Sequence, residues 1–323
     1  MILGLLSVLW ADQLHVVRAG DTVESLAGPA AEQVRRDNGL APGQQPGIGT
    51  VLRLPGGTDS VGLVLSLTGT GTLGAGGTPL VLGQPLPPGS VVCTAADSFL
   101  TIRLATSESG GTHDEVTLLG GTCVSLTGST GLGRQRSTLL DLQRGYLSVR
   151  PTLQDPGRVA VRTSDGVTAG DEGGFRVAVE EGATRTEALY RPVAVIGAGG
   201  EQPLQPGEGG RGRRGQAPSK PVKLPVPGSP EAPANDAAFR RPDFYWSPVD
   251  RAVGYRMELA SDADFQSLLL VRDIPGSPWL PDYLMLPYDV ERLYWRVSSL
   301  DRNGYYGVPS QAHRLNFPEG MRP

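Results

Sequence analysis

Histidine is scarce in this chain of 323 residues, and its scarcity limits the chemistry that the protein can support. The three histidines, His15, His113 and His313, stand singly, without acidic or cysteine neighbours at the spacing of metal ligands. Isolated histidines also make a Ser/His/Asp triad hard to assemble, and the sequence contains neither GxSxG nor HExxH. We therefore predict a protein that is not an enzyme, with no metal site and no cofactor.

Long apolar runs and a positive net charge are also missing. No run approaches the ~18 apolar residues of a membrane span, and the formal net charge of −4 offers no basic field to nucleic acid or to an anionic membrane. We expect no nucleic-acid partner and no transmembrane segment. Residues 1–11 (MILGLLSVLWA) resemble the apolar region and cleavage site of a signal peptide without its basic start. A short buried strand is the alternative interpretation.

There are only two cysteines, Cys93 and Cys123. In an exported protein such a pair inside one β domain is expected to form a disulfide, whereas in the cytosol both would be buried thiols. We favour export to the periplasm or cell envelope, and hence the disulfide. It would close a loop of 30 positions and stabilise the fold by roughly 3–4 kcal/mol in the chain-entropy model.

Glycine and proline, by contrast, are abundant, with 45 and 28 residues. This composition indicates many turns between short strands and argues against a helical protein. The length allows two or three domains, each with its own core. We predict a multidomain, mainly β protein.

Residues 12–56 read as a small βααβ unit, with strands at 14–18 and 51–54 around two short helices. The phrases HVVRAGDTVESLA, RRDNGLAPG and GTVLRLP resemble a LysM module, a family that binds glycans containing N-acetylglucosamine. The span from Asp21 to Asn38 is about three residues shorter than is usual in the family. Gly39 stands where a second asparagine is common.

The resemblance implies a glycan-binding groove between two loops, and peptidoglycan as its ligand. Small residues and backbone groups on both loops would meet the sugar's acetamido and hydroxyl groups. An alternative is that Asp21 or Thr22 only caps a helix and Asn38 only ends one. The residues of the predicted groove are Gly20, Asp21, Thr22 and Val23 on the first loop and Asn38, Gly39 and Leu40 on the second.

Residues 61–202 contain short runs with period-two alternation between glycine-rich turns, typical of an all-β domain. PLVLGQPLPPGSVVCTAADSFLTIRL, LLDLQRGYLSVR and VRTSDGVTAGDEGGFRVAVEEG resemble a FecR-type domain, although Gly173-Gly174-Phe175 replaces the family's Gly-Thr step. Residues 69–74 also fit GxGxxG. The glycine and proline that follow exclude the helix a dinucleotide site needs, so we predict a turn there.

Residues 203–238 are dominated by proline, glycine and charge and show no apolar periodicity, which predicts an extended linker. A basic patch lies within it, and it either touches anionic cell-wall polymers or is simply solvated. Its members are Arg211, Arg213, Arg214, Lys220 and Lys223.

Residues 239–318 again read as strands, with Trp246, Tyr255, Tyr294 and Trp295 at strand positions where aromatic rings would build the core. FYWSPVDRAVGYRMELASDADF and LYWRVSSLDRNGYYGVPS resemble the fibronectin type III-like domains of bacterial surface proteins.

Together these resemblances imply a periplasmic protein that holds peptidoglycan and presents its β domains to protein partners of the envelope, within a larger assembly. The alternative is a sensory regulator of the kind that FecR-type domains serve.

Overall fold

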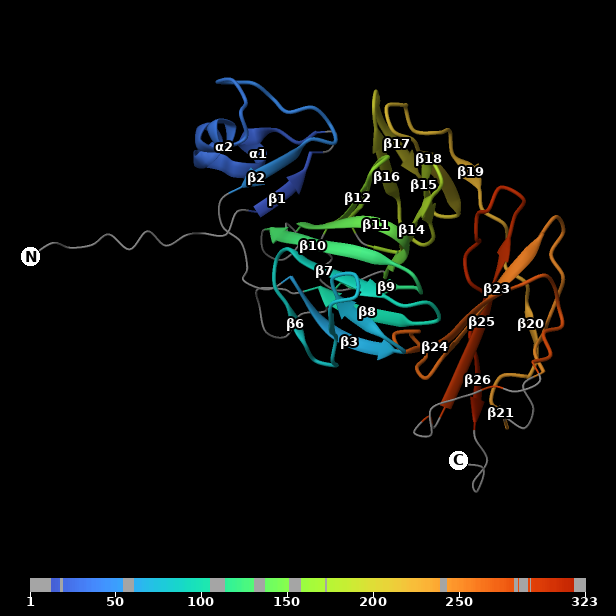
Figure 1. Ribbon diagram of the computed structural model, residues 1–323. Coiled ribbons are helices and arrows are strands. Elements are labelled where there is room, and N and C mark those ends of the chain that lie inside the picture. The colour runs from blue at the N-terminus through green and yellow to red at the C-terminus, as the bar shows by residue number, and fades with distance from the viewer. Residues whose placement is uncertain are drawn as a thin grey trace, which may run out of the picture.

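The structure is a computed structural model that describes residues 13–17, 20–54, 61–104, 114–130, 137–150, 158–171, 173–238, 243–281, 284, 290 and 292–316. The predicted signal segment, residues 1–11, lies outside the described residues. The protein is mainly β, as the composition predicts. A small N-terminal unit packs beside a large curled sheet, and a C-terminal β part follows on the sheet's other side (Figure 1).

The N-terminal unit has the predicted order of strand, helix, helix and strand. These elements are β1 (Gln13–Val16), α1 (Val23–Ala27), a 3-10 helix (Gly28–Ala30), α2 (Ala31–Asp37) and β2 (Val51–Leu54). Strands β1 and β2 pair antiparallel. The spacing of apolar residues puts Val23 and Val34 inside, where both are fully buried together with Leu52. Packing of this small core therefore holds two helices that are too short to be stable alone.

The described strands between Gly62 and Lys223 form one hydrogen-bonded network that curls into two layers (Figure 1). Within the described chain these strands are β3 (Gly62–Thr68), β4 (Gly71–Leu73), β5 (Thr78–Pro79), β6 (Pro85–Leu86), β7 (Ser90–Thr94), β8 (Phe99–Leu104), β9 (Glu115–Leu118), β10 (Cys123–Thr130), β11 (Ser137–Val149), β12 (Arg158–Thr163), β13 (Gly166–Gly170), β14 (Phe175–Glu180), β15 (Ala183–Ala188), β16 (Val193–Gly197), β17 (Gly200–Leu204), β18 (Glu208–Gly212) and β19 (Val222–Lys223).

Strand β11 joins the two layers. Its first half pairs with β10 and, in parallel, with β12, while its second half pairs with β9 and β14. The crossing point is Gly145, whose φ of 89° lies in the left-handed region. A Cβ there would lie 2.6 Å from the Cα of Thr122, so glycine is required where the strand changes layer.

The apolar residues that alternate along the strands pack between the two layers. Phe175, Leu140 and Ile102 are fully buried in this core, which draws on both layers. The residues of GxGxxG follow the end of β3, with Gly69 at φ 79° and β4 beginning at Gly71. The predicted turn between strands is present at residues 69 and 70, and residues 71–73 form a strand where a dinucleotide site needs a helix.

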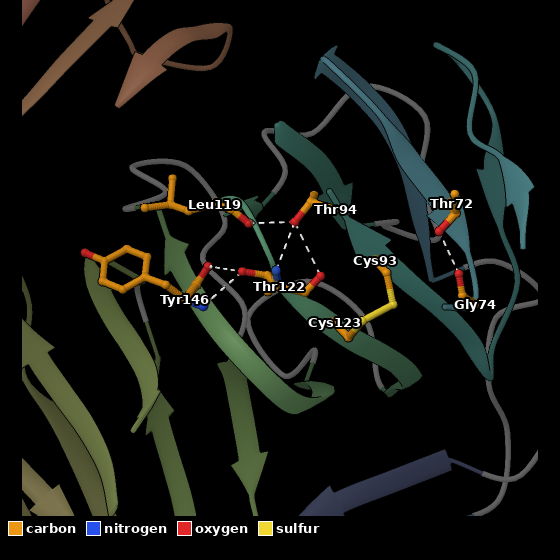
Figure 2. The surroundings of a disulfide bond; sticks show 8 residues. All are labelled: Thr72, Gly74, Cys93, Thr94, Leu119, Thr122, Cys123 and Tyr146. Carbon is orange, nitrogen blue, oxygen red and sulfur yellow. Dashed lines mark hydrogen bonds between the residues drawn. A yellow bond between two sulfur atoms is a disulfide. The ribbon is translucent and has the colours of Figure 1, made fainter. Parts of the chain in front are cut away.

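The predicted Cys93–Cys123 disulfide is present and joins β7 to β10, where the two cysteines lie directly opposite each other (Figure 2). The hydroxyl of Thr94 donates to the carbonyl oxygen of Leu119 at 2.6 Å and accepts from the amide of Thr122 at 3.1 Å. These hydrogen bonds add to the covalent link between β7 and the chain that leads into β10. The disulfide fits an exported protein.

The predicted linker at residues 203–238 is wrong over much of its length. Strands β17, β18 and β19 lie within it or overlap it, and β18 pairs with β15 along its whole length. The glycines that made this stretch look unstructured have a packing role, because a Cβ at Gly209 would lie 2.6 Å from ring atoms of Tyr305. Close approach of two β parts selects glycine there.

The C-terminal part contains two small sheets. One pairs β20 (Pro230–Ala232) with β22 (Tyr245–Trp246), and the other has the order β21 (Ala237–Ala238), β26 (His313–Asn316), β25 (Arg292–Leu300), β23 (Gly254–Ala260) and β24 (Leu268–Ile274). Trp246, Tyr255 and Trp295 are buried in its core, as predicted. Tyr294 is half-buried and packs instead against the cluster between the β parts.

Candidate functional site

The predicted glycan loops start with a helix cap. Thr22 has an extended backbone, and its hydroxyl accepts a 3.0 Å hydrogen bond from the amide of Ser25, whose own hydroxyl accepts from the amide of Thr22. This reciprocal pair satisfies amides that the first turn of a helix leaves free. Thr22 therefore has the capping role that the alternative interpretation gave it.

Most polar groups of these loops serve the fold of the unit. The amide of Val23 donates to Oε1 of Gln45 at 2.9 Å, and the Val23 side chain is fully buried. The side-chain amide of Asn38 donates to the carbonyl of Val34 at 2.7 Å. The amides of Gly39 and Leu40 close the end of α2. The loops thus offer a sugar mainly carbonyl oxygens and bare backbone.

Two glycines remain open to solvent. Gly20 (φ 89°) and Gly39 (φ 68°) are exposed, and a Cβ at either would have no heavy atom within 4 Å. An absent side chain at such a place is what lets a flat ligand approach the backbone. These glycines are the residues of the predicted groove that leave the backbone open to solvent.

Asp21 has a partner outside the N-terminal unit. Its Oδ2 atom lies 3.3 Å from Nη1 of Arg158 on β12, and the Asp21 side chain is only 15% exposed. Nε of Arg158 donates to Asp171 at 2.8 Å, so one guanidinium is shared between the two carboxylates. Gly49 also packs against the curled sheet, on β16, where a Cβ would lie 3.0 Å from Cγ2 of Ile196. No pattern in the sequence indicated this docking.

An ion pair inside the N-terminal unit stiffens the base of the same loops. Arg35 is 2% exposed and donates to Glu24, to Glu32 at 2.6 Å and to the carbonyl of Gln44 at 3.0 Å. The hydrogen bond from Arg35, assisted by one from Gln45, lowers the pKa of Glu24 to about 2. Glu24 therefore stays ionised at neutral pH and connects α1, α2 and the loop after α2.

A second and larger constellation lies between the curled sheet and the C-terminal part. Its apolar half joins Phe99 and Leu119 to Phe265 and Leu268, all buried. Side chains of the curled sheet also bind the backbone of the C-terminal part. The hydroxyl of Thr68 donates to the carbonyl of Leu268 at 2.6 Å. The hydroxyl of Thr101 donates to the carbonyl of Gln266, also at 2.6 Å.

The polar half is centred on the loop after β25. The amide of Tyr306 donates to Oε1 of Glu187 on β15 at 2.8 Å, and Nη1 of Arg176 on β14 donates to the carbonyl of Gly307 at 3.1 Å. Arg185 contacts the carbonyl of Gly304 in the same way. Three side chains of the curled sheet thus hold the backbone of one loop.

Arg256 on β23 completes this layer. Its guanidinium carbon lies 3.8 Å from the ring centroid of Tyr306 and 4.8 Å from that of Tyr146. Nε and Nη2 donate to the two oxygens of Asp273 at 2.9 and 3.0 Å. A planar guanidinium stacked on aromatic rings and paired bidentately is the strongest form of such a contact.

Neighbouring guanidiniums keep the buried carboxylates of this layer ionised. Burial alone would raise the pKa of Glu258, but the guanidiniums of Arg296, at 2.5 Å, and Arg176 outweigh it and lower the pKa. Burial also acts to raise the pKa of Asp273, and the hydrogen bond from Arg256 reverses that effect. Both carboxylates are thus ionised in the folded protein.

Sequence reasoning missed this layer because its residues alternate with core residues along their strands. In FRVAVE and TRTEAL the charged positions fall on the face opposite the core, which is ordinarily solvated in an antiparallel sheet. An indication was present in the loop RNGYYG, which places two adjacent aromatic rings in a turn.

Within the described residues, no three His, Cys, Asp or Glu side chains gather as a metal site would require. No helix in the same part of the chain is long and apolar enough to cross a membrane.

Comparisons with known proteins found only distant structural similarity. No family model matches the chain, and no curated protein matches it. Two crystal structures of a candidate anti-sigma factor from Parabacteroides distasonis are similar to part of it. The first is 15% identical with a TM-score of 0.30, over 41% of this chain and 58% of that one. The second is 17% identical with a TM-score of 0.27, over 39% and 59%. The chain spans less than two thirds of those solved chains, and at these TM-scores the likeness supports no conclusion about function.

Proposed function

We propose that the chain is a non-enzymatic protein of the bacterial envelope, in which two β parts locked together act as a scaffold and the N-terminal unit contacts peptidoglycan. The observation that carries the scaffold is the buried layer around Arg176, Glu187 and Arg256. Burying several charges between two domains is costly unless each is paired, and here each has a partner. Such a layer fixes one relative orientation, which is what a scaffold needs to present surfaces to partners.

Export to the periplasm is part of the same proposal. The disulfide between Cys93 and Cys123 supports it, because such bridges persist in oxidising compartments. The resemblance of the N-terminal unit to LysM modules supports the choice of an N-acetylglucosamine-containing glycan as the ligand.

The glycan contact is proposed at the open glycines Gly20 and Gly39. Because most amides of these loops serve the fold, the contact is expected to be weak, with a Kd in the millimolar to micromolar range, about −4 to −8 kcal/mol. Several copies in an assembly would then be needed for firm retention.

Co-sedimentation of the full chain with insoluble peptidoglycan tests the glycan contact. Gly39→Tyr places a ring over the loop, and Gly43→Tyr is a matched control because Gly43 is also exposed, has φ 72° and has open space around it. We expect Gly39→Tyr to weaken binding about tenfold, ~1.4 kcal/mol, and Gly43→Tyr to bind as the parent does. A parent chain that stays in the supernatant, or an equal loss in both variants, would contradict the proposal.

One observation favours a second candidate, a sensory regulator. Arg158 links the first glycan loop, through Asp21, to β12 of the curled sheet, so a ligand on that loop could act on the sheet. Amide hydrogen exchange with soluble peptidoglycan fragments separates the two functions. A regulator would show altered exchange in β12, whereas a passive anchor would show changes in residues 20–54 alone.

A further inference from the structure

The segment between β18 and β19 forms an arm on the surface of the curled sheet. The amide of Ser219 donates to the carbonyl of Arg211 at 2.9 Å, and the amide of Arg211 donates to the hydroxyl of Ser219 at 2.9 Å. A turn closes the arm, with the amide of Gln216 donating to the carbonyl of Arg213 at 3.1 Å. The arm therefore has a defined shape.

Arg211 belongs to the base of the arm and is not available to a ligand. Its guanidinium donates to Oε2 of Glu180 at 3.1 Å and to the carbonyl of Asn303 at 2.5 Å. It also lies 4.8 Å from the ring centroid of Tyr305. These contacts fasten the arm to the C-terminal part and bring Arg302, next to Asn303 in the chain, to the same region.

Five exposed cations surround this base: Arg213, Arg214, Lys220, Lys223 and Arg302. In the part of the chain that the structure describes, no acidic side chain pairs with Arg213, Lys220 or Arg302. Arg214 donates through Nε to the carbonyl of Ser164 and keeps its charge. Lys223 is opposite Glu208 in the strand pair, which offsets part of the positive field. The set is called the basic arm below.

We propose that the basic arm binds a phosphate-bearing polymer of the envelope. Four of the five cations lie along the hairpin from β18 to β19, and Arg302 lies in the loop after β25 that contacts its base. Charges spread along the chain in this way suit an extended polymer of repeated charges better than a single anion. Guanidiniums pair bidentately with phosphate oxygens, and ammoniums bind phosphate as point charges. Although the whole protein carries −4, salt screens distant charges beyond ~8 Å at physiological ionic strength. The positive field close to the basic arm therefore determines whether an anionic polymer binds there. The choice of an envelope polymer rests on the exported location proposed above.

Binding of linear inorganic polyphosphate to the full chain, measured at several salt concentrations, tests the proposal. The variant R213Q/K220Q/R302Q removes three cations of the arm, and R36Q/R251Q/R292Q removes three exposed cations elsewhere with the same change in net charge. We expect the arm variant to lose at least about tenfold in affinity and to show a shallower dependence of log K on log salt concentration. The control should remain within about twofold.

Three results would overturn it: no binding of polyphosphate by the parent chain at about 50 mM salt, an equal loss in the control variant, or equally tight binding of polygalacturonate, whose charges are carboxylates. Because no peptidoglycan is present, failure here leaves the glycan contact at Gly39 untouched. Failure of the co-sedimentation experiment in turn leaves the basic arm untouched.

Discussion

Arg176 on β14 and Glu187 on β15 lie almost wholly inside the protein, with 3% and 1% of their side chains exposed, and Nη1 of one is 3.5 Å from Oε2 of the other. Neither residue belongs to an apolar core. Both face the loop 301–307 of the C-terminal part, so their burial depends on that part being in place.

Removing one charge of this pair should be severely destabilising. Arg176→Met leaves the Glu187 carboxylate buried with reduced compensation, and the expected loss in the free energy of unfolding is about 3–5 kcal/mol. Arg272→Met is the matched control, because its 2.8 Å pair with Asp97 also joins the two β parts but is 51% and 72% exposed. That variant should lose less than about 1 kcal/mol. Chemical denaturation would measure both, and similar losses would argue against the buried layer.

Acid should weaken the same layer. Glu258 and Asp273 have folded pKa values below their ordinary values of 4.5 and 3.8. Their contribution is fully present above those ordinary values and is lost as the pH falls through the lowered ones. The midpoint of thermal unfolding should therefore drop steeply below about pH 4.5. Glu258→Gln should flatten this dependence, whereas Glu181→Gln, at an exposed turn, should leave it as steep as in the parent.

The disulfide gives a prediction about the curled sheet alone. Non-reducing mass mapping should find a peptide that contains both Cys93 and Cys123. Cys93→Ser with Cys123→Ser should lower the free energy of unfolding by roughly 3–4 kcal/mol. Two freely alkylated thiols in protein isolated from the envelope would contradict both the bridge and the proposed export.

A cut in the segment between β18 and β19 should leave the protein in one piece. A specific protease site introduced at the exposed turn between Gly215 and Gln216 separates the chain into two polypeptides, while the layer around Arg176 and Arg256 still joins the β parts. The nicked protein should therefore elute from a gel-filtration column as one species under native conditions. Elution as two separate fragments would show that covalent continuity, and not the layer, holds the parts together.

The sequence predicted those features that depend on local patterning. Alternating apolar residues predicted the β-rich character. The two cysteines in one β domain of a protein expected to be exported predicted the bridge, whose partners lie opposite each other on β7 and β10. The charged layer was not predictable, because Arg176, Arg185 and Glu187 have the period of a solvated face. Only the position of the loop 301–307, more than 100 residues later, makes that face an interior. The error at 203–238 has the same cause, since its glycines allow close packing and do not indicate disorder.

The fixed orientation of the two β parts is the claim on which the scaffold depends most. Pulsed electron paramagnetic resonance between spin labels at Val81→Cys and Val253→Cys measures it directly, because these exposed positions lie in different parts. We expect a single narrow distance distribution in the parent protein and a broader one in the Arg176→Met background. A broad distribution in the parent protein would contradict a fixed orientation of the two β parts.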